Sequence, residues 1–445
     1  MRKVLLAGAA IGAIALADAP EAYAQRAEFP QPYAPANAGP ALRTTPGVTV
    51  RLAGRYRFYA GYIDQDLDSD AAGNKLDNYD FFDYARLWTG FDGFAENGLQ
   101  YGATLEIRMG SGSASRGDDR GNLRYRRMYG YVGTPTMGQL RVGSGQVQAV
   151  ELMHTGHMNG KYGTGLWDGD APAMIIGPSS VSNNFWFSAS SGNNNTAIGY
   201  YSPQFYGFDF GVSYSPNNGN FGGDGSCSSV GTSCDRLSDS TSNAGTIKPT
   251  DIFDIMARYR GTFGGVGIAA SGGYRGSSTV DAVGNANAFD GLSVGLVGVE
   301  ASVAGFTFGG NLTWGTGNYG NGLTGAAGGL TPLAKKTTTS QVTVTDNDDL
   351  FGWQIGAGYR FGAFSVGLSY GEYDSEGSQT VSSDRSDKLF GIGGSYAVAP
   401  GFNLFADYLY GERKETGWDF ATGTAGTQNN KVDVSLFIIG TAFNW

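Results

Sequence analysis

The chain has 445 residues, a net charge of −10, a hydrophobic fraction of 41% and 73 glycines. The acidic charge argues against a nucleic-acid partner, and the glycines argue against a helical bundle, because each costs about 0.5–1 kcal/mol relative to alanine inside an element. A soluble chain of this length is expected to form two or more domains, yet no interior linker is visible, so one large closed sheet explains the length better.

Residues 1–24 have the pattern of a secretory signal peptide. A basic start precedes a short apolar run at 4–17, and residues 22–24 read Ala-Tyr-Ala, which suits cleavage. The apolar run is too short for a spanning helix, and no later segment reaches the ~18 apolar residues that such a helix needs. Residues 25–47 contain five prolines and are expected to form an extended segment before the folded domain.

From residue 48 onward, apolar and polar residues alternate with period two in segments that end at turns. In the first segment, the apolar residues from Val48 to Tyr62 share one face, and Arg51, Arg55 and Arg57 lie on the other. No second set of core strands remains to cover the apolar face, so we expect this face to contact lipid. We predict sixteen strands, starting near residues 48, 79, 98, 122, 137, 193, 207, 251, 265, 288, 305, 349, 363, 385, 401 and 431.

The predicted connections alternate between short turns, such as 93–98 and 399–401, and long loops, such as 64–78. This asymmetry is typical of outer-membrane barrels, and an even number of strands places both ends on the periplasmic side. The last segment carries Phe443 and Trp445 on its apolar face and is expected to close the barrel at the interface. Residues 48–445 are therefore predicted to form an all-β, 16-stranded antiparallel transmembrane β-barrel, surrounded by outer-membrane lipid and lipopolysaccharide.

Three stretches resemble the alphaproteobacterial porin family of trimeric general porins. They are Val50–Arg55 at the first strand, Tyr125–Pro135 at the fourth, and Ile198–Pro203 with Gly211–Pro216 at the sixth and seventh. The resemblance covers essentially the whole mature chain. It implies a homotrimer in which the third loop, here about 145–192, folds into the lumen and narrows a water-filled channel for passive diffusion of small hydrophilic solutes and ions.

Seven arginines of the first five strands alternate onto the pore-facing side: Arg51, Arg55, Arg57, Arg86, Arg108, Arg127 and Arg141. The resemblance implies that they form one wall of the constriction, opposite the third-loop carboxylates Glu151, Asp168 and Asp170. Opposed rows of charge create a transverse field that favours polar solutes. Alternatively, some arginines bond to wall carbonyls or to loop ends, and Asp168 and Asp170 belong to a surface turn. The net charge favours cations and the arginines favour anions; we expect a weak preference for cations.

A substrate-specific channel, for a sugar or another small polar nutrient, is the alternative function, because Tyr129 and Tyr131 also face inward as an aromatic track would require. An enzyme is not expected, since no nucleophile motif accompanies the two histidines. His154 and His157 have the spacing of a metal-binding pair, but no third ligand is evident, so no metal site is predicted there.

Two further patterns concern the loops. Cys227 and Cys234 are predicted to form a disulfide in an oxidising compartment. Alternating carboxylates in the first loop loosely resemble a calcium loop, although Ala71 stands where such a loop requires glycine: Asp64, Asp66, Asp68 and Asp70. A solvated acidic loop is the favoured interpretation, with structural calcium or divalent bridging to lipopolysaccharide as the alternative. No other cofactor is expected.

Overall fold

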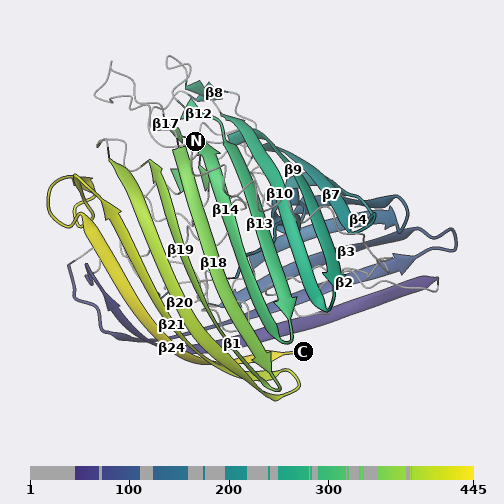
Figure 1. The fold of residues 1–445 in the computed structure, drawn as a ribbon, viewed down its shortest axis with the longest axis horizontal. Helices are drawn as coiled ribbons and strands as arrows, with labels where there is room; N and C mark the ends of the chain where they lie inside the picture. Colours follow the sequence, from purple (N-terminus) through teal and green to yellow (C-terminus); the bar gives the residue numbers. More distant parts are fainter. Residues whose placement is uncertain are drawn as a thin grey trace.

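The computed structural model describes residues 46–69, 73–110, 124–158, 174–175, 196–217, 239–240, 249–279, 281–282, 289–316, 318–319, 330–331, 333–334, 349–376, 381 and 383–445. Within this part of the chain, sixteen strands close into a single barrel in which each strand pairs antiparallel with both neighbours (Figure 1). The predicted fold is therefore confirmed. The signal peptide, most of the proline-rich segment, and Asp168, Asp170, Cys227 and Cys234 lie outside the described residues.

The barrel strands follow one another in chain order. They are β1 (Gly47–Gln65), β2 (Tyr79–Phe94), β3 (Gln100–Gly110), β4 (Arg124–Thr134), β5 (Gly138–Ser144), β6 (Thr196–Tyr201), β7 (Phe208–Asn217), β9 (Pro249–Phe263), β10 (Val266–Thr279), β13 (Ser293–Val303), β14 (Phe306–Thr316), β18 (Asp349–Phe361), β19 (Phe364–Glu376), β20 (Asp384–Ala399), β21 (Phe402–Glu415) and β24 (Lys431–Asn444).

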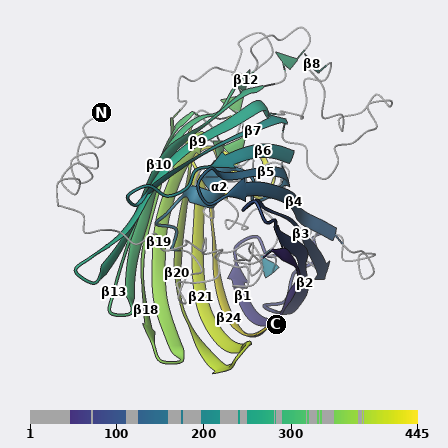
Figure 2. The ribbon, with the colours of Figure 1, turned by 90° about the vertical axis from the view of Figure 1, so that its right-hand side faces the viewer.

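The long connections carry additional short elements. The helix α2 (Ala149–Met153) follows β5 and lies beside β6, β7, β9 and β10 (Figure 2). Four small two-stranded sheets form from β8 (Asp239–Ser240) with β11 (Asp281–Ala282), β12 (Phe289–Asp290) with β17 (Leu333–Ala334), β15 (Asn318–Tyr319) with β16 (Leu330–Thr331), and β22 (Trp418–Asp419) with β23 (Thr424–Ala425). The short turns after β9, β13 and β18 and the pieces β8, β12 and β17 lie at opposite ends of the barrel (Figure 1).

The predicted strand starts agree with the structure to within three residues in fifteen cases. The exception is the strand predicted near residue 288, since β13 begins at Ser293. Residues Phe289 and Asp290 pair instead with β17, outside the barrel ladder, so the barrel strand begins only after this separate pairing. Period-two patterning cannot distinguish the two pairings, because both use extended backbone.

Barrel closure joins the first strand to the last. β1 pairs with β24 from Arg55 opposite Asn444 to Gln65 opposite Val434. Beyond this ladder, the backbone nitrogens of Gly54 and Trp445 each donate to the carbonyl of the other residue, at 2.9 and 3.1 Å. The Trp445 ring lies over Gly54, where a β-carbon would be 2.1 Å from Cζ2. The glycine thus makes room for the ring that ends the closing strand.

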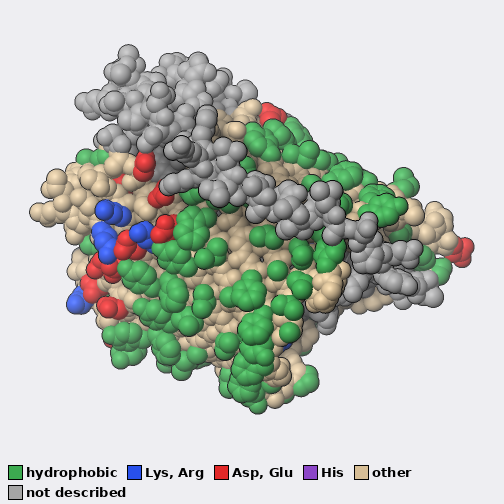
Figure 3. Space-filling view, viewed as in Figure 1, with side chains coloured by type: hydrophobic (Ala, Val, Ile, Leu, Met, Phe, Trp, Pro, Cys, Tyr) green, Lys and Arg blue, Asp and Glu red, His purple; other side chains and the backbone are tan. Residues whose placement is uncertain are grey.

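The two barrel faces differ in side-chain type. On β9, Phe253 and Ile255 are exposed on the outer face, whereas Asp254 and Arg258 are buried on the inner face. Hydrophobic side chains cover much of the outer surface in Figure 3. Closure of the barrel satisfies the backbone hydrogen bonds and leaves no sheet edge in contact with lipid. The apolar side chains on the outer face suit the hydrocarbon region. No helix among the described residues is long and apolar enough to cross a membrane.

The inner face also carries an apolar region. Tyr59 on β1, Phe82 and Tyr84 on β2, and Leu436 and Ile438 on β24 are buried inward-facing members of one cluster. Met174, from the long connection after β5, belongs to the same cluster. Because a fully hydrated lumen would leave such side chains in water, part of the barrel interior is packed rather than open.

Candidate channel constriction

All seven arginines predicted to face the pore lie on the inward side of β1 to β5. On β1, the buried Arg51 and Arg55 alternate with the exposed Val50 and Leu52. Arg86 and Arg141 are buried in the same way on β2 and β5, and Arg57, Arg108 and Arg127 are partly buried on β1, β3 and β4. The structure therefore places all seven guanidinium groups on the inner wall, and their role in a constriction stays a prediction.

Glu106 on β3 is the centre of one charged cluster. Its carboxylate is fully buried and lies 3.2 Å from Arg108 Nε, 3.6 Å from Arg127 Nη1 and 3.9 Å from Arg86 Nη1. In the antiparallel register of β3 and β4, Arg127 lies directly opposite Glu106, and the register shifts only beyond this pair. Three guanidinium groups around one carboxylate leave the cluster positively charged, which a low-dielectric wall tolerates only with further partners.

The further partner comes from the connection after β5. The chain turns at Gly145 and Gln146, which have left-handed φ angles of 69° and 55°, and α2 follows. Glu151 on α2 accepts a hydrogen bond from Arg127 Nη2 at 3.0 Å and another from the Gln146 backbone nitrogen at 2.8 Å. Glu151, predicted as a loop carboxylate facing the arginines, thus makes direct contact with the arginine wall.

The arginines of β1 have different partners. Arg51 Nε lies 2.5 Å from Asp92 Oδ2, and its Nη2 donates to Thr104 Oγ1 at 3.0 Å. The Tyr131 hydroxyl also donates to Asp92. The Arg51–Asp92 ion pair therefore links β1 to β2, and its contact with Tyr131 links both strands to β4. Sequence reasoning missed both inward carboxylates, Asp92 and Glu106, although both lie on the polar face of an alternating strand.

Aromatic rings surround the remaining arginines. The Arg55 guanidinium lies 5.6 Å from the centre of the Trp88 ring, and its Nε donates to Asn444 Oδ1 at 3.3 Å. Arg57 Nη1 donates to the Tyr59 hydroxyl at 3.1 Å. Arg141 lies between the rings of Tyr129 and Tyr201, at 5.2 and 5.4 Å. Arg141 Nη1 also donates to the Gln146 carbonyl at 3.0 Å. This bond to the end of a loop is of the kind expected if an arginine serves the wall structure rather than the constriction.

A second inward charged cluster lies on β7, β9 and β10. Arg258 Nη2 and Arg260 Nη2 lie 2.6 and 2.8 Å from Asp209 Oδ2, and Arg275 Nε lies 2.7 Å from Asp254 Oδ1. The sequence signal for this cluster was present, because Arg258 and Arg260 alternate with apolar residues. A third inward cluster pairs Arg385 with Glu415 and Arg413 with Asp387 on β20 and β21.

Residues 145–158 follow the inner wall from β6 to β18. Ala149 N donates to Ser213 Oγ at 3.0 Å, Arg258 Nη1 donates to the Leu152 carbonyl at 3.1 Å, and Thr155 Oγ1 donates to the Gly298 carbonyl at 2.9 Å.

Five wall glycines make room for this segment, and we call them the glycine track: Gly199, Gly211, Gly298, Gly309 and Gly356. A β-carbon built on any of them would lie 2.0–2.7 Å from an atom of Val147, Met153, Thr155 or Met158. The segment and the wall are therefore closely fitted, through backbone atoms at Gly199 and Gly298 and through methionine side chains at the other three glycines.

The two histidines lie at the end of this segment. Their rings are 5.8 Å apart, and His154 Nδ1 lies 2.8 Å from the Val150 carbonyl oxygen. Within the described ranges, no group of three or more His, Cys, Asp or Glu side chains could hold a metal ion.

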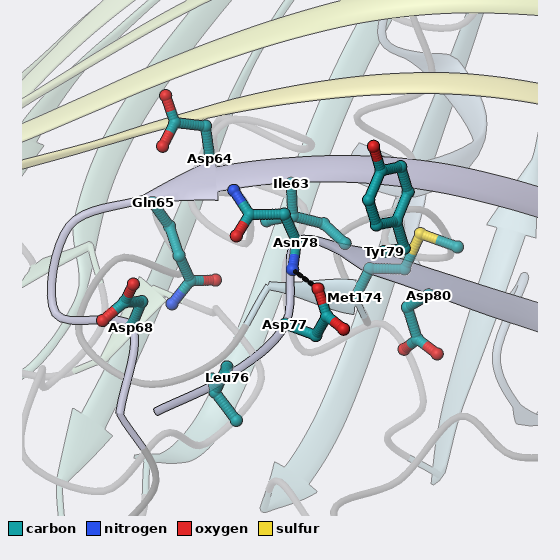
Figure 4. A pocket seen from close by; sticks show the side chains of 10 residues that line it. All are labelled: Ile63, Asp64, Gln65, Asp68, Leu76, Asp77, Asn78, Tyr79, Asp80 and Met174. Atoms are coloured by element: carbon teal, nitrogen blue, oxygen red, sulfur yellow. Dashed lines mark hydrogen bonds between the residues drawn. The ribbon is translucent and has the colours of Figure 1, made fainter. Parts of the chain in front are cut away.

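An acidic pocket of about 170 Å³ lies at the loop end of β1 and β2 (Figure 4). Its lining includes Met174 and four carboxylates: Asp64, Asp68, Asp77 and Asp80. Asp77 Oδ1 accepts a hydrogen bond from its neighbour Asn78 N at 2.7 Å, and Asp68 lies 3.5 Å from Lys75 Nζ. Asp70 and Ala71 lie outside the described residues, and calcium in this loop stays a prediction.

Comparisons with known proteins agree with this architecture. A family model described as Gram-negative porin matches residues 6–416. Among solved structures, the chain is similar to an anion-selective porin from Comamonas acidovorans, with 15% identity over 90% of this chain and 100% of that chain and a TM-score of 0.53. It is also similar to the outer-membrane channel DcaP of Acinetobacter baumannii, with 15% identity, 91% and 100% coverage and a TM-score of 0.52.

A third similar structure is the trimer form of in-vitro folded OmpT, an outer-membrane protein of Vibrio cholerae, with 14% identity, 89% and 99% coverage and a TM-score of 0.51. At these identities the structures bear on the fold alone. The comparison with curated proteins found no match. The family match spans most of the chain, and the closed sixteen-stranded barrel agrees with it: the chain belongs to the Gram-negative porin family, whose members are outer-membrane β-barrels.

Proposed function

We propose that this protein is a trimeric diffusion porin of the alphaproteobacterial type, through which small hydrophilic solutes and ions cross the outer membrane. The observation that carries the proposal is the contact between Arg127 on the wall and Glu151 on α2, at 3.0 Å. It joins an arginine-rich inner wall to the connection after β5, so cationic and anionic groups meet inside the barrel. Such an arrangement suits a narrowed aqueous path and requires no catalytic step.

The outer face suits the proposed surroundings. Apolar side chains on β24, such as Phe437 and Ile439, fit the hydrocarbon region. Beyond them, towards the long connections, Glu372, Lys388 and Glu412 stand opposite one another on β19, β20 and β21. Charged side chains gather beside the hydrophobic ones on this side of Figure 3. This charged edge fits the lipopolysaccharide headgroup region. The proposed trimer is based on the similar structure of OmpT, which is described as a trimer form.

Single-channel conductance of the refolded full chain in a planar bilayer tests the proposal. A trimeric diffusion pore gives large ohmic steps in near-equal groups of three, and vesicles that contain it swell in small sugars at rates that fall with solute size. A correctly folded barrel that conducts no ions would refute the channel function.

A substrate-specific channel is the second candidate. Aromatic rings on the inner wall favour it: the partly buried Phe405 packs 5.4 Å from Tyr59, measured between ring centres, and Tyr129 and Tyr131 also face inward. A track of rings would bind one class of solute and saturate, whereas a diffusion pore would not. Small conductance steps that one solute class blocks at low concentration would favour this candidate over the general pore.

A further inference from the structure

Most of the inward ion pairs described above expose the cation more than the anion; Arg258 and Asp209, at 4% and 6%, are the exception. Arg108 and Arg127 side chains are 36% and 13% exposed, whereas their shared partner Glu106 is 0% exposed. Arg260 is 21% exposed, and its partner Asp209 is 6% exposed. In each of these three pairs the guanidinium is the more accessible member of the pair. A solute in the barrel therefore meets the positive member of the pair first.

The numbers of charged groups favour the same sign. On β1 to β4 and α2, the described inward side chains include six guanidinium groups and, away from the loop end of β2, three carboxylates: Arg51, Arg55, Arg57, Arg86, Arg108 and Arg127 with Asp92, Glu106 and Glu151. On β7, β9 and β10, three guanidinium groups surround two carboxylates: Arg258, Arg260 and Arg275 with Asp209 and Asp254. Both clusters carry excess positive charge in a setting where low-dielectric walls strengthen its field.

Several of the acidic residues that make the net charge negative lie away from these inward clusters. Glu372 and Glu412 face outward, and the acidic pocket of Figure 4 lies at the loop end of β1 and β2. Among the described residues, two inward carboxylates are partly exposed: Asp80, which lines that pocket, and Glu300, near the end of β13. At about 0.1 M salt, charges more than ~10 Å away are largely screened. The potential beside Arg108, Arg127 and Arg260 therefore depends on the charged groups near them more than on the net charge of −10.

We infer that the channel is selective for anions, and that Arg108, Arg127 and Arg260 are the positions where small oxyanions, either carboxylates or phosphate, bind transiently during passage. The inference rests on the proposed channel function and names its solute class. It opposes the weak cation preference expected from the sequence, which relied on net charge. Guanidinium groups suit this role because their planar N–H groups match the two oxygens of a carboxylate or phosphate.

The reversal potential of the refolded full chain under a potassium chloride gradient is the direct test. The sign is expected to report chloride as the more permeant ion. Arg108→Gln and Arg260→Gln keep a hydrogen-bonding side chain but remove the charge, and each is expected to lower the chloride-to-potassium permeability ratio by up to about five-fold. The matched control is Lys388→Gln, which removes one positive charge from the outer face and is expected to leave the ratio unchanged.

A second measurement examines the oxyanion class. Inorganic phosphate or acetate, added to the chloride solution, is expected to reduce the chloride current more in the parent protein than in Arg108→Gln. A cation-selective reversal potential, or an equal effect of Lys388→Gln and Arg108→Gln, would overturn the inference while the observed conductance still supports a channel. No conductance at all would instead refute the proposed function, so the two failures are distinguishable.

Discussion

The glycine track makes a specific prediction about how residues 145–158 are held. At Gly298 on β13, a β-carbon would lie 2.0 Å from the Thr155 carbonyl oxygen and 2.8 Å from its carbonyl carbon. Real β-carbon contacts essentially never fall below 3.0 Å. Gly298→Ala therefore requires Thr155 to move by about 1 Å, because the obstacle is backbone and cannot rotate away.

Three hydrogen bonds depend on the position of Thr155. Its nitrogen donates to Ser271 Oγ at 2.9 Å, its hydroxyl lies 3.0 Å from the same oxygen, and its hydroxyl donates to the Gly298 carbonyl at 2.9 Å. A net contribution of about 0.5–1.5 kcal/mol for each bond gives about 1.5–4.5 kcal/mol if all three are lost. The population of detached segment would then rise by about ten-fold to 10³-fold.

Single-channel recording reads this change directly. Because the wall lies behind the segment, a detached segment moves towards the lumen, so Gly298→Ala is expected to show a lower mean conductance and more frequent brief closures. The control is Gly272→Ala on the neighbouring β10, where a β-carbon would meet Val297 Cγ1 at an ordinary 3.6 Å. If a folded Gly298→Ala barrel conducts and closes like the parent, the wall contact does not hold the segment.

Two further predictions concern stability and covalent structure. Arg385→Ala leaves the fully buried Glu415 without its guanidinium partner and is expected to cost about 3–5 kcal/mol in unfolding free energy; Lys388→Ala, whose exposed side chain lies 3.9 Å from Glu372, is expected to cost about 1 kcal/mol or less. Equal shifts in denaturant midpoint for the two variants would contradict this reasoning. Cys227 and Cys234 are expected to react with a maleimide only after reduction, and labelling of the unreduced, unfolded chain would disprove the disulfide.

Local alternation explains why the strands could be predicted so well. On a barrel with lipid outside, each strand must present apolar side chains on one face, so period-two patterning identifies the strand and the inward direction of residues such as Arg51 and Arg86. The same rule failed near residue 288, where Phe289 and Asp290 are extended but pair with β17. Extended backbone is a local property, whereas the choice of partner strand depends on the whole fold.

The ion-pair partners could not be predicted in the same way. Glu106 meets Arg127 across the pairing of β3 with β4, and Arg258 meets Asp209 across the pairing of β9 with β7. Sequence spacing contains neither register, since Arg258 and Asp209 are 49 residues apart. The predicted loop carboxylate Glu151 does reach the arginine wall, whereas Asp168 and Asp170 lie outside the described residues and stay predictions.

By itself, the sequence determined the membrane barrel, its sixteen strands and the inward side of seven arginines, because alternation and turn residues act over a few neighbouring positions. Only the tertiary structure decided which carboxylates lie behind those arginines, which glycines accept residues 145–158, and where the acidic charge is located relative to the interior. These features depend on strand register and on the depth of each side chain in the wall, and both follow from closing the whole sheet.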